Sequence, residues 1–127
     1  MEKIVFLPGA SGNLDFWKPL IEFLPKKYEK QIIGYPGFGR IAEDTRLKSF
    51  SDLQEYVTGK INSESILIAQ SMGGIFAVNK AFTDPSLIKG LVLIATSGGI
   101  DLTPFNVQDW RTEYQEQYPR YPEWFMT

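Results

Sequence analysis

The chain contains no histidine and no cysteine among its 127 residues. The absence of histidine removes the side chain that most often acts as a general base near neutral pH, and also the commonest metal ligand. The absence of cysteine excludes disulfide bonds and thiolate metal sites, and it leaves the redox compartment open. We therefore expect neither a metal site nor a disulfide framework.

Long apolar segments and blocks of charge are also missing. No apolar run approaches the roughly 18 residues that a transmembrane helix needs. The N-terminal apolar run is too short for a secretory signal, because Pro8 and Gly9 end it. Thirteen basic and fifteen acidic residues give a net charge of -2, with no basic cluster. We expect a cytoplasmic protein with no membrane span and no nucleic-acid partner.

Four short runs rich in isoleucine, valine and leucine predict β-strands. With 43% hydrophobic and 14% aromatic residues, the chain has enough apolar side chains for one core. The runs are continuously apolar rather than alternating, which is typical of parallel strands covered on both faces. They are Ile4–Leu7, Gln31–Gly34, Ser65–Ala69 and Gly90–Ala95.

Helical patterns lie between these runs. Asp15–Leu24 ends before Pro25 and places Phe16, Leu20, Phe23 and Leu24 on one face. Ser51-Asp52-Leu53-Gln54 has the form of a capping box and predicts a helix to about Ile61. A third helix is expected over Gly73–Phe82. The alternation predicts an α/β fold, with about four parallel strands between helices on both faces, in three layers.

The last residues differ in character from the rest. We divide the chain into a core over residues 1–103 and an aromatic-rich helical tail over residues 104–127. Val107, Trp110, Tyr114 and Tyr118 fall on one helical face of this tail. We interpret this stripe as packing surface, with a lid that lines a substrate site as the alternative.

The segment around Ser71 carries the chemical signal. An apolar strand runs directly into Ser71, and Gly73 and Gly74 open the helix that follows. A sharp strand-to-helix turn projects the serine hydroxyl outward and needs small neighbours. The N-terminal N–H groups of that helix favour a developing oxyanion. The alternative is a serine that only caps the helix.

Ala69-Gln70-Ser71-Met72-Gly73 resembles the G-x-S-x-G nucleophile elbow of α/β-hydrolases, with alanine in place of the first glycine. Three other segments are similar to family segments in the same order. Leu7–Asn13 is similar to the strand-end H-G-x loop, with Pro8 in place of histidine. Gly34–Arg40 is similar to the D-x-P-G-x-G-x-S loop, although Gly34 replaces the aspartate and the serine is absent. Leu91–Ser97 is similar to the strand after the elbow helix.

The resemblance implies a serine hydrolase of the esterase type that needs no cofactor. Ser71 would be the nucleophile, and the backbone N–H groups of Ala10 and Met72 would form the oxyanion hole. A pocket for a small acyl or ester substrate would be lined by Gly9, Ser11 and Gln70. The family's histidine and late acid follow later strands, so we expect a partial fold that stops near the start of the cap. With an incomplete triad, the chain alone should be nearly inactive towards esters.

No other side chain is a convincing substitute base. We interpret Asp101 as a surface or helix-capping residue, and we place Lys80 and Lys89 away from the serine. Gly37–Ala42 also fits the dinucleotide pattern G-x-G-x-x-A. However, Pro36 precedes this segment and the polar run Glu43–Arg46 follows it, so we expect no nucleotide cofactor.

Two alternatives to a hydrolase stay open. The chain could be a non-catalytic small-molecule-binding or self-assembling module, or a partner chain could supply the missing aspartate and histidine. The family's strand order would place the four predicted strands as second, first, third and fourth, and it would leave the strand Gly90–Ala95 with an unpaired edge. We therefore expect a homo-oligomer, strand exchange, or coverage of that edge by the aromatic tail.

Overall fold

Strands and helices alternate along the chain, as the sequence predicts. The computed structural model describes residues 2–106 and 121–126. The predicted α/β class is confirmed by the order of the elements: β1 (Lys3–Leu7), η1 (Leu14–Trp17), α1 (Lys18–Phe23), β2 (Glu29–Ile32), α2 (Phe50–Gly59), β3 (Ser65–Gln70), α3 (Met72–Thr83), η2 (Pro85–Leu87), β4 (Ile88–Ile94), η3 (Thr103–Phe105) and α5 (Glu123–Met126).

The four strands form one parallel sheet in the order β2-β1-β3-β4. Val5 of β1 lies beside Gln31 on one side and Leu67 on the other, and Leu67 lies beside Leu91. The order confirms the one that the resemblance implied. The chain moves outward in opposite directions from β1 and from β3, so the sheet has its topological switch point between these two strands.

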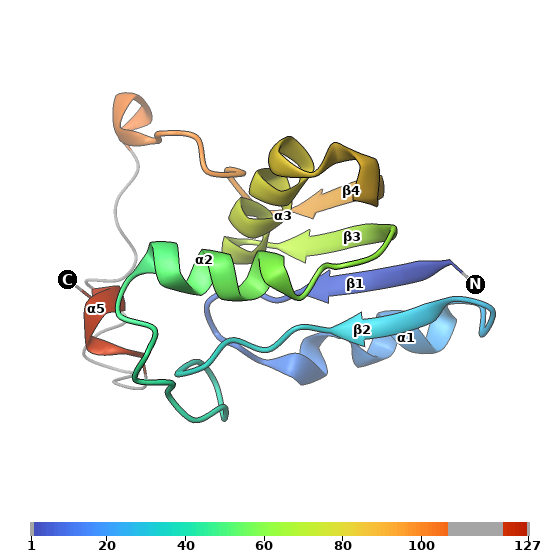
Figure 1. Ribbon diagram of the computed structural model, residues 1–127, viewed down its shortest axis with the longest axis horizontal. Coiled ribbons are helices and arrows are strands. Elements are labelled where there is room, and N and C mark those ends of the chain that lie inside the picture. Colours follow the sequence, from blue (N-terminus) through green and yellow to red (C-terminus); the bar gives the residue numbers. More distant parts are fainter. Residues whose placement is uncertain (1, 107–120, 127) are drawn as a thin grey trace.

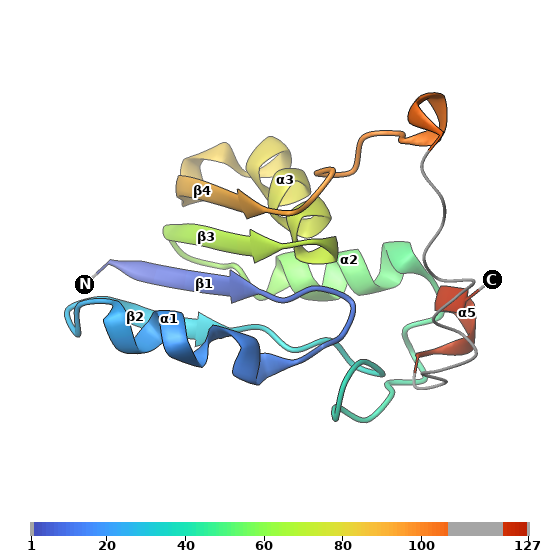
Figure 2. The same cartoon turned by 180° about the vertical axis from the view of Figure 1, so that it is seen from behind.

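Helices cover both faces of the sheet, which confirms three layers. α1 lies on one face, whereas α2 and α3 lie on the other (Figures 1 and 2). Alternating strand residues supply the two cores. On the α2/α3 side the core includes Val5, Leu7, Leu67, Ala69, Leu53, Val57 and Phe76. On the α1 side it comprises Ile4, Phe6, Trp17 and Ile68.

β2 begins and ends earlier than the sequence predicts. The expected strand was Gln31–Gly34, but the strand spans Glu29–Ile32, and Glu29 and Lys30 pair with β1. Since β2 lies at the edge of the sheet, polar residues can occupy it with their side chains in water. Ile33 still donates its N–H to the Phe6 carbonyl at 3.0 Å, although it lies beyond the strand.

The predicted packing face of the first helix is wrong at three of its four residues, and only Leu24 packs against the core on the α1 side. Phe16, Leu20 and Phe23 are 50%, 37% and 88% exposed, whereas Trp17 is buried. Because η1 is a 3-10 helix with three residues per turn, the sequence positions that face the sheet shift. Trp17 instead packs on Phe6, with 5.2 Å between ring centroids.

The cap of α2 is also two residues earlier than predicted. The hydroxyl of Ser49, rather than that of Ser51, accepts the Asp52 N–H at 3.1 Å. The Asp52 carboxylate accepts the Lys48 N–H at 2.8 Å, so the two side chains together satisfy donors at the helix start.

The predicted helical stripe of the tail lies outside the described residues. In the described part of the tail, Tyr121, Trp124 and Phe125 surround Phe38, with ring centroids 4.9 to 6.2 Å apart. The end of the tail thus packs on the loop after β2 (Figure 1). No helix in the described parts of the chain is long and apolar enough to cross a membrane.

Candidate active site

Ser71 lies at the turn between β3 and α3, at the carboxyl end of the sheet. Its backbone angles are φ 52° and ψ -119°, a conformation that residues with a Cβ rarely adopt. Such a backbone costs about 1–3 kcal/mol and persists only where the surroundings impose it. The Ser71 N–H donates to the Ile94 carbonyl at 2.9 Å, and its own carbonyl accepts the Gly74 N–H at 3.0 Å. Strand and helix thereby hold the turn from both sides.

Gly73 and Gly74 allow α3 to begin close to the sheet. A Cβ at Gly73 would overlap the Leu7 carbonyl and would lie 2.7 Å from the Pro8 carbonyl oxygen. A Cβ at Gly74 would overlap the side chain of Thr96, which follows β4. The first turn of α3 is therefore in contact with the strand ends on both sides of β3, and this contact requires two residues without side chains.

The loop after β1 lies directly against the Ser71 turn. The Gly9 N–H donates to the Gln70 side-chain oxygen Oε1 at 3.0 Å. A Cβ at Gly9 would lie 3.2 Å from the Ser71 Cβ. These contacts join the carboxyl ends of β1 and β3 at the switch point, which is where ligands bind in open α/β sheets.

The two proposed oxyanion donors lie on this loop and on α3. Ala10 and Met72 are both buried. Neither N–H donates a hydrogen bond within residues 2–106 and 121–126, and the Ser71 hydroxyl makes none there either. Both backbone donors are thus available near the serine, as an oxyanion hole requires.

The other two predicted pocket residues have partners in the protein. Ser11 is exposed, and its hydroxyl accepts the Asn13 N–H at 3.3 Å in the turn before η1. The side-chain amide oxygen of Gln70 accepts the Gly9 N–H. Both side chains stabilise the loop geometry, and direct contact of either with a substrate stays a prediction.

Tyr35 supports the β1 loop from the interior, a role that the sequence does not reveal. The buried Tyr35 hydroxyl donates to the Pro8 carbonyl at 2.6 Å. Burial raises the pKa of this phenol well above its ordinary value. Tyr35 was part of the recognised Gly34–Arg40 loop, but nothing in the spacing indicates which residue it contacts. Its ring also packs on Phe76 of α3, with centroids 5.3 Å apart.

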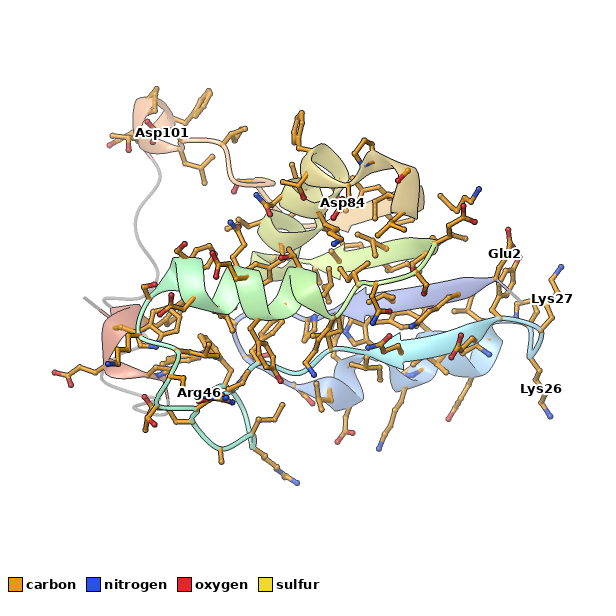
Figure 3. All side chains as sticks on the ribbon, viewed as in Figure 1. Glu2, Lys26, Lys27, Arg46, Asp84 and Asp101 are labelled. Atoms are coloured by element: carbon orange, nitrogen blue, oxygen red, sulfur yellow. The ribbon has the colours of Figure 1, made fainter. Side chains whose placement is uncertain are left out.

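The candidate substitute bases lie elsewhere, as predicted. Asp101 is exposed and accepts the Thr103 N–H at 2.9 Å, and this hydrogen bond lowers the pKa of its carboxyl. Lys80 pairs with Asp84 at 2.8 Å at the end of α3, about 13 Å from Ser71 along the helix. Figure 3 shows Asp101 and Asp84 on separate parts of the molecule. No cluster of three potential metal ligands occurs in the described residues.

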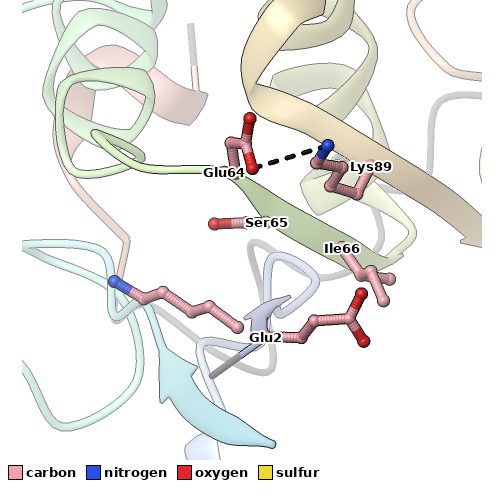
Figure 4. A pocket seen from close by; sticks show the side chains of 6 residues that line it. Glu2, Glu64, Ser65, Ile66 and Lys89 are labelled. Atoms are coloured by element: carbon pink, nitrogen blue, oxygen red, sulfur yellow. Dashed lines mark ion pairs between the residues drawn. The ribbon is translucent and has the colours of Figure 1, made fainter.

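Lys89 lies at the opposite end of the sheet from Ser71. It pairs with Glu64 at 3.4 Å beside a hollow at the amino ends of β1, β3 and β4 (Figure 4). This hollow does not belong to the candidate active site. It is lined by Glu2, Lys3, Glu64, Ser65, Ile66 and Lys89.

Comparisons with known proteins identify the family of the fold. A family model described as the alpha/beta hydrolase fold matches residues 3–127. The pimeloyl-[acyl-carrier protein] methyl ester esterase of Wigglesworthia glossinidia brevipalpis is 31% identical over 94 residues, covering 74% of this chain and 36% of that protein. The esterase of the same name from Yersinia pestis is 28% identical with the same coverage. The chain thus spans about a third of the length of these curated relatives.

Solved structures show the same fold. NosK from Streptomyces actuosus has a TM-score of 0.74 and 22% identity, covering 93% of this chain and 54% of that chain. A probable hydrolytic enzyme from Pseudomonas aeruginosa PAO1 has a TM-score of 0.71 and 22% identity, covering 92% of this chain and 43% of that chain.

Proposed function

This chain belongs to the α/β-hydrolase fold family, and from that premise we propose that it is an esterase-type serine hydrolase module with Ser71 as its nucleophile. The observation that carries the proposal is the strained backbone of Ser71 between β3 and α3. It lies next to the N–H groups of Ala10 and Met72, which donate no hydrogen bond within the part of the chain that the structure describes. The names of the sequence relatives favour an acyl ester, such as a methyl ester, as the class of substrate.

The proposed reaction begins with attack of the Ser71 Oγ on the ester carbonyl carbon. The carbonyl oxygen becomes an oxyanion, which accepts hydrogen bonds from the N–H groups of Ala10 and Met72. The ester C–O bond then breaks, the alcohol leaves with a proton, and water hydrolyses the acyl-serine. A base must take the Oγ proton, and no imidazole exists in the 127 residues.

The absence of a base determines the rate of ester hydrolysis that we expect. Serine hydrolases without a functional triad retain about 10³–10⁴-fold acceleration over water from the oxyanion hole and binding. We therefore propose that the chain alone is nearly inactive. We also propose that residues 104–127 form the start of a cap, because the described end of this segment packs on Phe38 beside the carboxyl ends of the strands.

A non-catalytic binding module is the second candidate, and the absence of histidine favours it. In that case the loop from Gly9 to Gly12 and the Ser71 turn would hold a small acyl ligand without turnover. Binding of the ligand would then be equal in the wild type and in Ser71→Ala, because no covalent bond to Ser71 would form.

Hydrolysis of a short-chain p-nitrophenyl ester by the wild type and by Ser71→Ala tests the proposal. We expect the two proteins to hydrolyse the ester at similar, very low rates, far below those of a serine hydrolase with a complete triad. A wild type that turns over far faster than Ser71→Ala would show that Ser71 is activated without histidine. In that case the account of the missing base is wrong.

A further inference from the structure

One peptide unit of the loop after β1 is held by hydrogen bonds at both of its polar groups. The Pro8 carbonyl accepts the Tyr35 hydroxyl at 2.6 Å, and the Gly9 N–H donates to the Gln70 side-chain oxygen Oε1 at 3.0 Å. These two groups belong to the same peptide bond, which is planar and trans, so they point in opposite directions. Rotation of this peptide away from its orientation in the structure would therefore break both hydrogen bonds.

The Tyr35 hydroxyl reaches the Pro8 carbonyl from the α2/α3 side of the sheet. Tyr35 belongs to the buried core on that side, and its ring packs on Phe38 and Phe76, with centroids 6.0 and 5.3 Å away. Its backbone carbonyl accepts the Phe38 N–H at 3.0 Å in the turn that follows. Ring and backbone thus both restrict where this hydroxyl can lie.

The Gln70 side chain approaches the same peptide from the α1 side. Successive side chains of a strand point to opposite faces of the sheet. Ile66 and Ile68 of β3 belong to or pack against the core on the α1 side, so Gln70, two residues further, lies on that face as well. Its backbone is fixed at the end of β3, in register with Ile94 of β4. The Pro8–Gly9 peptide is thus bound between side chains from both faces of the sheet.

The next peptide in the loop carries the Ala10 N–H, which is the proposed oxyanion donor. The carbonyl of this peptide, that of Gly9, accepts the Gly12 N–H at 3.1 Å. Since this peptide is trans as well, the Ala10 N–H points in the opposite direction, away from Gly12. The orientation of the two successive peptides therefore determines where this N–H points.

Gly9 lies between the two peptides and by itself would let them rotate. Glycine has no Cβ and adopts more backbone conformations than other residues. A Cβ at Gly9 would lie 2.6 Å from the Gln70 oxygen Oε1 and 3.2 Å from the Ser71 Cβ, so the close approach of the loop to the Ser71 turn requires this glycine. The loop therefore needs another source of rigidity at the residue that brings it next to the serine.

We propose that Tyr35 and Gln70 are positioning residues, which together fix the Pro8–Gly9 peptide and thereby direct the Ala10 N–H to the oxyanion. This role rests on the proposed function of Ser71. Preorganised donors stabilise a developing oxyanion only where they already point at it. Loss of either hydrogen bond therefore weakens the stabilisation of a tetrahedral anion and leaves the serine itself in place.

Binding of phenylboronic acid tests the proposal. The Ser71 oxygen would form a bond to boron and release its proton to the solvent, and the tetrahedral anionic adduct would present an oxygen to the oxyanion hole. Boron NMR distinguishes this adduct from the free acid, so a dissociation constant can be measured without turnover. We expect an adduct with the wild type and none with Ser71→Ala.

The two positioning residues should each affect the stability of this adduct. Tyr35→Phe and Gln70→Met should weaken it about tenfold, less than the roughly 10²–10³-fold loss in rate on removal of an oxyanion donor, because the Ala10 N–H remains. Tyr28→Phe and Gln31→Met are the matched controls, before and on β2, and should bind phenylboronic acid as the wild type does.

The double variant Tyr35→Phe/Gln70→Met separates a shared role from two independent ones. It should weaken the adduct less than the roughly hundredfold product of two independent losses, because either substitution frees the same peptide. A loss equal to that product would overturn the proposal that both side chains act through the Pro8–Gly9 peptide.

The direction of the Ala10 N–H can also be measured without a ligand. Residual dipolar couplings report the direction of each N–H bond relative to the whole molecule. The Ala10 coupling should change in Tyr35→Phe and in Gln70→Met, whereas the couplings within β1 and β3 should stay the same because the sheet is intact. These unchanged couplings would show that each variant is folded.

The outcomes distinguish a failure of positioning from a failure of the proposed function. An Ala10 coupling that does not change, or adducts of both single variants that are as stable as that of the wild type, would overturn the positioning role and leave Ser71 as the nucleophile. Equal behaviour of the wild type and Ser71→Ala towards phenylboronic acid would contradict the proposed function, and the positioning role with it.

Discussion

Ser71 occupies a backbone conformation that suits glycine better than serine. The surrounding turn imposes its positive φ of 52°, and this conformation costs free energy. We expect Ser71→Gly to raise the free energy of unfolding by about 1 kcal/mol, because relief of the strain exceeds the extra chain entropy of glycine. Urea denaturation would measure the change.

Ser71→Ala is the matched control for this prediction, because alanine keeps the Cβ that causes the strain. It should leave the free energy of unfolding close to that of the wild type. Equal stability of the glycine and alanine variants would mean that the turn stores no strain at this residue, and the structural argument for a nucleophile elbow would lose its main support.

Tyr35 links the stability of the fold to pH through the β1 loop. Removing its hydroxyl leaves the buried Pro8 carbonyl without this donor, so Tyr35→Phe should lower the free energy of unfolding by about 1–3 kcal/mol at neutral pH. Tyr28→Phe, at a tyrosine that is only partly buried, is the control and should change stability less.

The pH dependence has a definite sign. Burial raises the pKa of folded Tyr35 above the ordinary value of 10.0 that applies to the unfolded chain. The contribution of the neutral phenol is therefore complete below about pH 10 and is lost as the pH rises towards the folded-state pKa. Urea denaturation between pH 8 and 11 should show a smaller decline for Tyr35→Phe. An equal decline in both proteins would contradict this role of Tyr35.

The sequence predicts single residues of the site only where a motif is local. Ser71, Met72 and Gly73 follow one another in the chain, and the β1 loop could be recognised from Gly9 and Gly12. The Tyr35 hydroxyl contact spans 27 positions, and the Gln70 contact with Gly9 spans 61. Contacts at such separations depend on the folded sheet and leave no spacing signal.

At the scale of the elements, the position of α3 against the sheet depends on its two N-terminal glycines, Gly73 and Gly74. Alanine is the better helix former by about 1 kcal/mol. Even so, Gly73→Ala should lower the free energy of unfolding by about 1–3 kcal/mol, because the new Cβ would overlap the Leu7 carbonyl. Gly59→Ala, at the end of α2 with nothing within 4 Å, should leave stability unchanged or raise it. Thermal unfolding monitored by circular dichroism would compare the two variants with the wild type. A Gly73→Ala variant as stable as the wild type would contradict the close approach of α3 to the end of β1.

The existence and order of the elements followed from the sequence, but their ends and faces did not always. Continuous apolar runs located β1 and β3 because buried parallel strands need them, and the same pattern located β4, although most of its residues are exposed. β2 lies at the edge of the described sheet, and its polar residues gave no such signal. The 3-10 geometry of η1 changed the period on which the face of α1 was predicted, and this put Trp17 rather than Phe16 in the core.

At the scale of the whole molecule, the sheet topology brings the parts of the proposed site together. The carboxyl ends of β1 and β3 meet at the switch point and bring Ser71 next to Gly9 and two backbone N–H groups that donate no hydrogen bond within the described residues. The same 127 residues contain no imidazole. Strand order and loop positions were predictable from the four segments that resemble the family. Which surfaces stay exposed depended on the helix positions and needed the structure.

If Ser71 has the geometry of a nucleophile and lacks only a base, a base added to the solution should increase its activity. Imidazole added to the solution can supply a base, so the measurement is hydrolysis of a p-nitrophenyl ester against imidazole concentration for the wild type and Ser71→Ala. We predict a rate that rises more steeply for the wild type, because imidazole alone acts equally with both proteins. Identical rates for the two proteins at every imidazole concentration would contradict the account.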